Sequence, residues 1–225
     1  MKILLLIQRS QLSTRLPKAI LVSTSALLGL SFFPTLLAAP ALAHHPLGGR
    51  LPGSAFEGFL SGLAHPVLGP DHFLFILAIG ILAATTRRGW LLPVAFVATS
   101  FLGSLLHLAE ISVPLLEIVI SASLLLAGWL LARSQQAALG FMVGLGAIAG
   151  VFHGYAYAEA IFGAEMMPLS AYLTGLAAVQ LSIALGVCAI TQRLTASSDG
   201  PGQALRYAGF TFFGAGMAFL ASTLA

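Results

Sequence analysis

Charged residues are scarce in this chain: they make up 8% of its 225 residues, whereas soluble globular domains carry about 25%. Hydrophobic residues account for 58% of the chain. So little charge over so long a chain excludes one or two soluble domains and indicates an integral membrane protein. We therefore expect an all-α, polytopic helical protein embedded in the lipid bilayer.

Basic residues are also few after the N-terminal segment. The formal net charge is +3, but Lys2, Arg9, Arg15 and Lys18 all lie near the N-terminus, and removing these four positive charges changes the net charge from +3 to −1. The basic balance therefore indicates a targeting signal, and it provides no surface for nucleic acid or another anionic partner.

Cysteine is nearly absent, because Cys188 is the only one and it lies in an apolar run. A single cysteine excludes an intrachain disulfide, a thiolate metal site and structural zinc held by several cysteines. The chain also lacks an ATP-binding loop, and none of its six histidines lies in the His-Glu-x-x-His pattern of metalloproteases. We therefore do not expect an enzyme, and an intramembrane enzyme that activates a metal-bound water is the least favoured interpretation.

The N-terminal residues predict a signal peptide over residues 1–43. A basic stretch precedes an apolar run, and Ala41-Leu42-Ala43 has the small-x-small pattern of a cleavage site. Cleavage after Ala43 makes His44 the new N-terminus, where the amine and the imidazole can chelate one metal ion. The alternative is an uncleaved anchor helix, because the basic region is long and prolines interrupt the apolar run.

Residues 44–225 are predicted to form one transmembrane domain of six spans. The first apolar run is too long for one straight helix, since a span needs roughly 20 residues. Pro66, Gly69 and Pro70 predict a break in it, with a short helix ending near His65 and a second one beginning near Pro70. Such breaks are tolerated where the backbone lines a cavity or is buried in protein. The predicted spans are about residues 55–85, 90–108, 113–132, 136–158, 168–192 and 204–224.

Arginines in the loops predict the orientation of these spans. Cytoplasmic loops carry an excess of basic residues, and five of the six arginines after the signal fall on one side, leaving only Arg50 on the other. Both mature termini are then expected on the outer, periplasmic side of the plasma (inner) membrane. Every histidine of the mature chain falls in the outer half, which indicates a site loaded from outside. The five arginines are Arg87, Arg88, Arg133, Arg193 and Arg206.

The segment His65-Pro66-Val67-Leu68-Gly69-Pro70-Asp71-His72 places two imidazoles and one carboxylate beside a long apolar run. Ionisable side chains at membrane depth are costly and usually functional, and imidazole with carboxylate suits divalent transition metals. The predicted break lets His65, Asp71 and His72 converge as metal ligands. The alternative is that Asp71 caps a helix and the histidines bond to backbone carbonyls.

A second candidate ligand, His153, lies in the glycine-rich fourth span. It shares a helix face with Tyr157, whereas Glu159 points elsewhere and could serve as a ligand only if the helix frays. The alternative for His153 is a hydrogen-bonded core residue. The glycines of this span are predicted to let helices pack closely. They are Gly140, Gly144, Gly146, Gly150 and Gly154.

Three further polar residues lie near the outer ends of the predicted spans. His107 and Glu110 are three residues apart, so they either share a helix face or form a polar cap on the second span. Glu117 lies about one turn inside the third span, where it either fixes an imidazole tautomer or lines an outer vestibule.

The two polar segments carry a resemblance to a known family. HPVLGPDH resembles the HPxxGxDH signature of the HupE/UreJ family, and FHGYAYAE is similar to its second signature. The resemblance covers the whole mature chain and implies a nickel permease, or a secondary nickel or cobalt transporter, tied to hydrogenase and urease maturation. Tyr157 stands where many members have a histidine, and Ala158 replaces a glycine, so one potential ligand is missing. The matched residues are His65, Asp71, His72, His153 and Glu159.

The leading interpretation is a secondary transporter for a divalent transition metal, with nickel first and copper or cobalt as alternatives. The metal would be captured at the outer face, partly dehydrated by the histidines and Asp71, and released inward. Copper is an alternative because it outcompetes nickel at nitrogen-rich sites. A membrane metal-binding protein without flux is an alternative of another class, because the inner half of the proposed path carries few polar groups.

Overall fold

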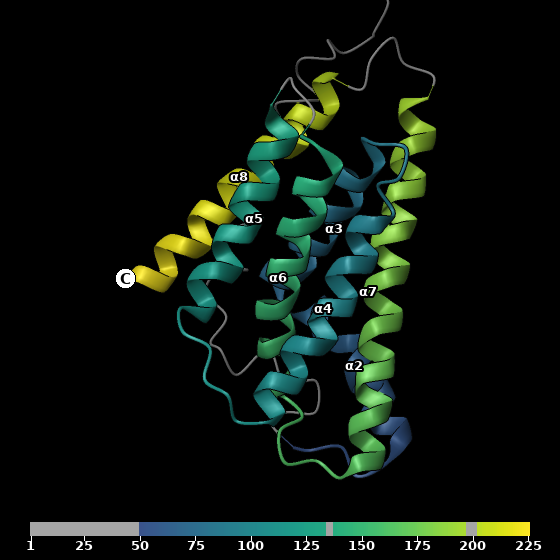
Figure 1. The fold of residues 1–225 in the computed structure, drawn as a ribbon, viewed down its shortest axis with the longest axis vertical. Helices are drawn as coiled ribbons and strands as arrows, with labels where there is room; N and C mark the ends of the chain where they lie inside the picture. The colour runs from purple at the N-terminus through teal and green to yellow at the C-terminus, as the bar shows by residue number, and fades with distance from the viewer. Residues whose placement is uncertain (1–49, 134–136, 197–201) are drawn as a thin grey trace, which may run out of the picture. The chain divides into compact units, whose positions relative to one another are not determined.

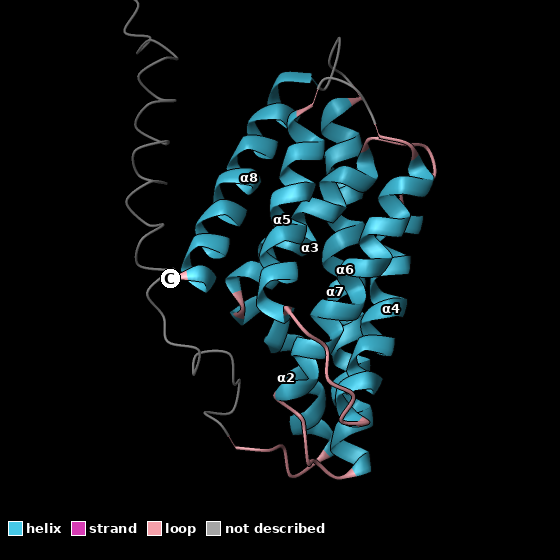
Figure 2. Cartoon of the chain, turned by 60° about the vertical axis from the view of Figure 1, so that its left-hand side comes forward, coloured by secondary structure: helices cyan, strands magenta, loops and turns pink. Residues whose placement is uncertain are grey.

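The described part of the chain is a bundle of helices joined by loops (Figures 1 and 2). A computed structural model describes residues 50–133, 137–196 and 202–225, and no strand occurs in these ranges. The predicted signal peptide and His44 lie outside the described residues. The helices are α2 (Ala55–Leu68), α3 (Pro70–Ala84), α4 (Leu91–Leu108), α5 (Leu116–Ala132), α6 (Leu139–Glu159), α7 (Met166–Thr195) and α8 (Gly202–Leu224).

Most of these helices are long and apolar enough to cross a membrane. Within the described residues α4, α6, α7 and α8 meet this condition singly, and the bent pair of α2 and α3 meets it together. Helix α5 is apolar but has only 17 residues, at the short end of what spans a bilayer. The all-helical membrane architecture is therefore confirmed, while the number of six spans stays a prediction.

The predicted break in the first span is present. Helices α2 and α3 meet at Gly69 and are bent by 80°. Helix α2 nevertheless continues through Pro66 to Leu68, beyond the end predicted near His65. Pro66 lacks the N–H that would bond the carbonyl of Gly62 in the preceding turn, but it does not prevent the last turn from closing, because the Gly69 N–H donates to the His65 carbonyl at 3.2 Å.

The helices pack in close pairs, α2 with α7, α4 with α6 and α5 with α8, and α3 lies among them. Glycines make these close approaches possible, because a Cβ would collide with the backbone of the partner helix. In α6 the prediction holds for Gly150 and Gly154, which face the α4 backbone, and for Gly146, which faces Leu92 of α4. It is wrong for Gly140 and Gly144, which face open space.

Helices α3, α5 and α7 end, and α4, α6 and α8 begin, at one end of the bundle, at the top of Figure 1, and these helix ends and the α3–α4 loop contain the five arginines predicted to share one side. Arg206 at the start of α8 donates from Nε to the carbonyl of Ala132 at the end of α5, at 3.2 Å. Both tryptophans of the chain, Trp90 and Trp129, lie at this end and are 52% and 44% exposed. Tryptophan is enriched at membrane–water interfaces, so this end has the composition of an interface.

Candidate metal-binding site

The bend at Gly69 brings the two histidines of the first motif together. Pro70 is the first residue of α3, where its fixed φ suits a helix start, and Asp71 lies in the first turn. His65 lies in the last turn of α2, and its ring centroid is 6.2 Å from that of His72. The bend thus places His65 and His72 near each other, while the convergence of His65, Asp71 and His72 as metal ligands stays a prediction.

A direct contact joins His72 on α3 to His153 on α6. Their Nδ1 atoms are 3.0 Å apart, and the two side chains are 5% and 0% exposed. A hydrogen bond between two ring nitrogens requires one N–H donor and one lone pair. The contact therefore makes one Nδ1 a donor and leaves the other as a base, and both histidines are held in fixed orientations.

Ser123 of α5 assigns the tautomers of this pair. Its hydroxyl donates its single proton to the carbonyl of Ile120 at 2.6 Å, and it lies 3.0 Å from Nε2 of His153. With its proton used, the hydroxyl accepts from Nε2–H of His153. His153 then carries its lone pair on Nδ1 and accepts from Nδ1–H of His72. This is an assignment from the hydrogen-bond network.

Aromatic side chains enclose the histidine cluster. Phe75 stacks on the His153 ring with centroids 4.5 Å apart, and Phe96 meets the same ring edge-on at 5.5 Å. Tyr157 is fully buried and lies 4.5 Å from the His72 ring and 5.4 Å from the His65 ring. This shell excludes water, which strengthens electrostatic interactions inside the cluster.

Asp71 and Tyr157 leave polar atoms directed into this apolar surrounding. Asp71 is half-buried, and its Oδ1 has no hydrogen-bond partner among the described residues. The Tyr157 hydroxyl likewise has no such partner there, although the Asp71 carboxylate interacts with it electrostatically. Buried polar atoms without partners are costly, and in a membrane helix they are usually functional.

Glu159, another predicted ligand, lies away from this cluster. Glu159 is exposed at the end of α6, and its spacing from His153 turns it to another face of the helix. His44 lies outside the described residues. His107 contacts the rings of Tyr155 and Phe162, with centroids 4.5 and 5.5 Å away.

The cluster does not form a closed three-ligand site as it stands. Within the described ranges, no group of three or more His, Cys, Asp or Glu side chains is placed to hold one ion. The His72–His153 pair is the part that is already assembled. The assignment of His65, Asp71, His72, His153, His44 and Glu159 as metal ligands stays a prediction.

The sequence interpretation did not assign roles to Ser123, Phe75 or Tyr172. Ser123 is a hydroxyl residue in the otherwise apolar helix α5, and such residues often bond across membrane helices. That signal singles out a small set of serines but does not tell which of them meets a histidine. Tyr172 donates from its hydroxyl to the Tyr157 carbonyl at 2.7 Å and joins α7 to α6.

The fold and this cluster define a class: a helical membrane protein that buries a histidine pair beside a broken helix. The sequence model of the HupE / UreJ protein family matches residues 32–219, and the chain belongs to this family. It is 31% identical over 157 residues to protein HupE of Rhizobium leguminosarum bv. viciae, which covers 67% of this chain and 77% of that protein. No solved structure matches the chain.

Proposed function

We propose that the protein is a secondary transporter, or permease, for a divalent transition metal, with nickel as the leading candidate. The observation that carries this proposal is the buried Nδ1–Nδ1 contact of 3.0 Å between His72 and His153. Two imidazoles enclosed by apolar helices form a ligand pair for such a metal. Membership of the HupE/UreJ family supports the same substrate class.

The 3.0 Å separation of the two nitrogens is that of an ordinary hydrogen bond, so it does not select one metal over another. Imidazole ligands suit nickel, copper and zinc. Nickel is the leading candidate because of the family to which the chain belongs. Copper and cobalt remain the alternatives to nickel.

His153 already has the tautomer that metal binding at Nδ1 requires, because Ser123 accepts from its Nε2–H. His72 has to move its proton from Nδ1 to Nε2 when the metal enters. His65 and Asp71 then close the site from the α2–α3 break, and the Asp71 carboxylate offsets part of the cation's charge. We propose His44 and Glu159 as accessory ligands nearer the outer surface.

The inward half of the proposed path bears on whether the protein transports metal or binds it without flux. A cavity of about 200 Å³ between α3, α5 and α6 extends from Ser123 to Met142, toward the arginine end. This space supports an inward route. Its lining is almost wholly apolar, however, and that favours a second candidate function, a membrane protein that binds metal without carrying it.

Flux measurements separate the two functions. Purified protein in proteoliposomes is loaded with nickel, cobalt, copper or zinc on one side, and metal arriving on the other side is counted. A transporter gives saturable flux of one metal that follows an imposed membrane potential. Metal that binds with no flux above protein-free vesicles identifies a protein that binds metal without carrying it. The absence of both binding and flux contradicts both functions.

Asp71→Asn tests the site itself, because the amide keeps the shape and removes the charge. The expected result is a loss of nickel binding of at least about 10–100-fold. Glu165→Gln is the matched control, since Glu165 is an exposed carboxylate at the N-cap of α7. If a folded Asp71→Asn protein binds nickel like the parent, Asp71 does not belong to the metal site.

A further inference from the structure

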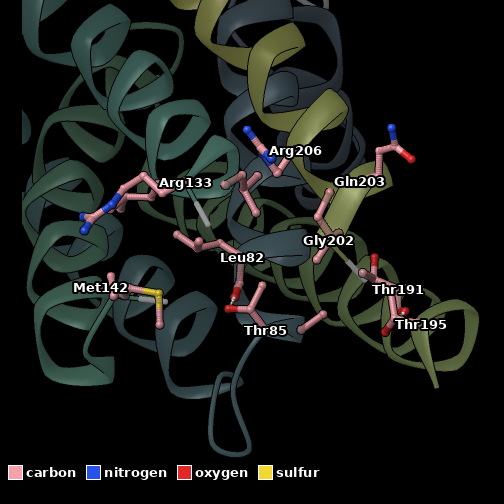
Figure 3. A pocket seen from close by; sticks show the side chains of 14 residues that line it. Leu82, Thr85, Arg133, Met142, Thr191, Thr195, Gly202, Gln203 and Arg206 are labelled. Carbon is pink, nitrogen blue, oxygen red and sulfur yellow. Dashed lines mark hydrogen bonds between the residues drawn. The ribbon is translucent and has the colours of Figure 1, made fainter. Parts of the chain in front are cut away.

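A pocket of about 490 Å³ lies at the arginine end, far from the histidine cluster along the helices. Its volume is within the range of about 300–1,000 Å³ that is typical of ligand pockets. Figure 3 shows α8 above the pocket with Arg206 and Gln203, α7 on the right with Thr191 and Thr195, and α3 in the centre. None of the proposed metal ligands lines it.

The lining combines polar and apolar side chains. The polar ones include Arg206, Gln203 and three threonines, and the apolar ones are leucines, alanines and Met142. Arg206 donates from Nε to the Ala132 carbonyl at 3.2 Å, which among the described residues leaves its two Nη groups for a ligand. The threonines are Thr85, Thr191 and Thr195, and the leucines are Leu82, Leu130, Leu131 and Leu205.

The pocket lies between helices that do not pack against each other. Helix α8 packs along α5 and touches α3, whereas α7 packs against α2, α3 and α4. Both α7 and α8 line the pocket together with α3 and α5, so it lies where α3, α5 and α7 end and α8 begins.

The surroundings place this pocket at the depth of lipid headgroups. Arg133, which also lines it, lies over the exposed Trp129 ring with its guanidinium carbon 4.6 Å from the ring centroid. Tryptophan and arginine are both typical of the membrane–water interface. The arginines at this end also identify it as the cytoplasmic side, where anionic lipids bind in basic pockets between helices.

We propose that this pocket binds a membrane phospholipid with an anionic headgroup, such as phosphatidylglycerol. Its phosphate is held by the Nη groups of Arg206, since a guanidinium forms paired hydrogen bonds to phosphate oxygens. The first turn of α8, which begins at Gly202 in the lining, adds the positive end of a helix dipole. A free phosphate ion shares the headgroup chemistry, but the apolar part of the lining provides it no contacts, whereas acyl chains can pack there.

The test measures lipid bound to detergent-purified full-length protein. Native mass spectrometry counts phosphatidylglycerol and phosphatidylcholine adducts across a lipid titration, for the parent and for Arg206→Gln, Arg206→Lys and Arg193→Gln. Arg193 is the matched control, because it is an exposed arginine at the same end that does not line the pocket. A titration with inorganic phosphate as competitor distinguishes a lipid from a free anion.

The expected result is one phosphatidylglycerol per chain, bound at least about fivefold more weakly by Arg206→Gln. Arg206→Lys retains most of the binding, and Arg193→Gln binds like the parent. Equal binding of phosphatidylcholine, parent-like binding by Arg206→Gln, or an equal loss in Arg193→Gln overturns the proposal. Displacement of the lipid by inorganic phosphate at concentrations comparable to the lipid also overturns it, in favour of a free-anion site.

Discussion

At the scale of single residues, the state of His153 depends on a hydroxyl from another helix. The Ser123 hydroxyl accepts a hydrogen bond from Nε2–H of His153 and donates one to the carbonyl of Ile120, so the imidazole presents the lone pair of Nδ1 to His72. Groups that orient a metal-binding histidine through its other nitrogen commonly matter almost as much as the ligands. The chemistry of the pair therefore depends on α5 as well as on α3 and α6.

Ser123→Ala is expected to weaken nickel binding by about 10–100-fold. The substitution leaves Nε2–H of His153 without an acceptor, so the proton is no longer held on that ring nitrogen. Titration calorimetry on the purified variant measures the nickel affinity. Ser121→Ala is the control, since Ser121 lies on the same helix and is more deeply buried than Ser123. Unchanged binding in Ser123→Ala, or the same loss in Ser121→Ala, contradicts the assigned role of Ser123.

Replacing each of the two buried tyrosines, Tyr157 and Tyr172, by phenylalanine is expected to change the free energy of unfolding in opposite directions. The Tyr157 hydroxyl has no hydrogen-bond partner among the described residues, so Tyr157→Phe should raise the free energy of unfolding by about 1 kcal/mol. The Tyr172 hydroxyl donates to the Tyr157 carbonyl at 2.7 Å, so Tyr172→Phe should lower it by a similar amount. Thermal unfolding of both metal-free variants checks the signs, and a fall in Tm for Tyr157→Phe means that its hydroxyl is partnered.

At the scale of helices, the glycine face of α6 sets the position of His153. Gly154 lies against the backbone of Ser100 on α4, and the Ser104 hydroxyl donates to the Gly154 carbonyl at 2.8 Å. His153 is the neighbour of Gly154, so the α4–α6 crossing holds the imidazole at its distance from α3. Packing between helices that carry no ligand thus contributes to the geometry of the site.

Gly154→Ala is expected to destabilise the protein by about 1–3 kcal/mol, because the new methyl group forces α6 away from α4. Metal affinity should fall with it, since His153 moves with the helix. Gly144→Ala is the matched control on the same helix, where nothing lies within 4 Å, and it should raise the free energy of unfolding by about 0.5–1 kcal/mol because alanine is favoured over glycine inside a helix. Calorimetric unfolding measures both, and equal effects of the two changes would contradict the packing argument.

At the scale of the whole molecule, the two ends of the described bundle differ in composition. Arg133 and Arg206 lie at one end together with both tryptophans, and the α3–α4 loop with Arg87 and Arg88 reaches the same end. The opposite end contains the start of α7 and the ion pair of Arg50 with Glu57, at 2.9 Å. From the positive-inside rule we expect the arginine-rich end to lie in the cytoplasm.

Labelling with a membrane-impermeant maleimide tests this orientation in intact cells whose outer membrane is permeabilised. In a Cys188→Ala background, Met166→Cys should react from outside, because Met166 is 76% exposed at the start of α7. Arg88→Cys, in the exposed α3–α4 loop, should react only after the inner membrane is opened. The reverse pattern would invert the topology and place the histidine cluster nearer the cytoplasmic side.

The sequence by itself determined the class of the protein and the position of its break. Apolar runs and scarce charge determine helices in a bilayer, and Pro70 after Gly69 determines where a helix begins, because both effects are local to the chain. The histidines of both motifs were found in the same way, since ionisable groups are rare in apolar runs. Glycine spacing predicted close packing but not which glycines face a partner.

Only the tertiary structure decided how these residues meet. Ser123, His153 and His72 come from three helices, and their hydrogen bonds depend on crossing angles and helix rotations that no local pattern encodes. The same is true of Gly144, which has the spacing of a packing residue and faces open space, while Gly154 faces Ser100. Contacts between segments far apart in the chain follow from the packing of all helices together, and for that reason the site emerged from the fold.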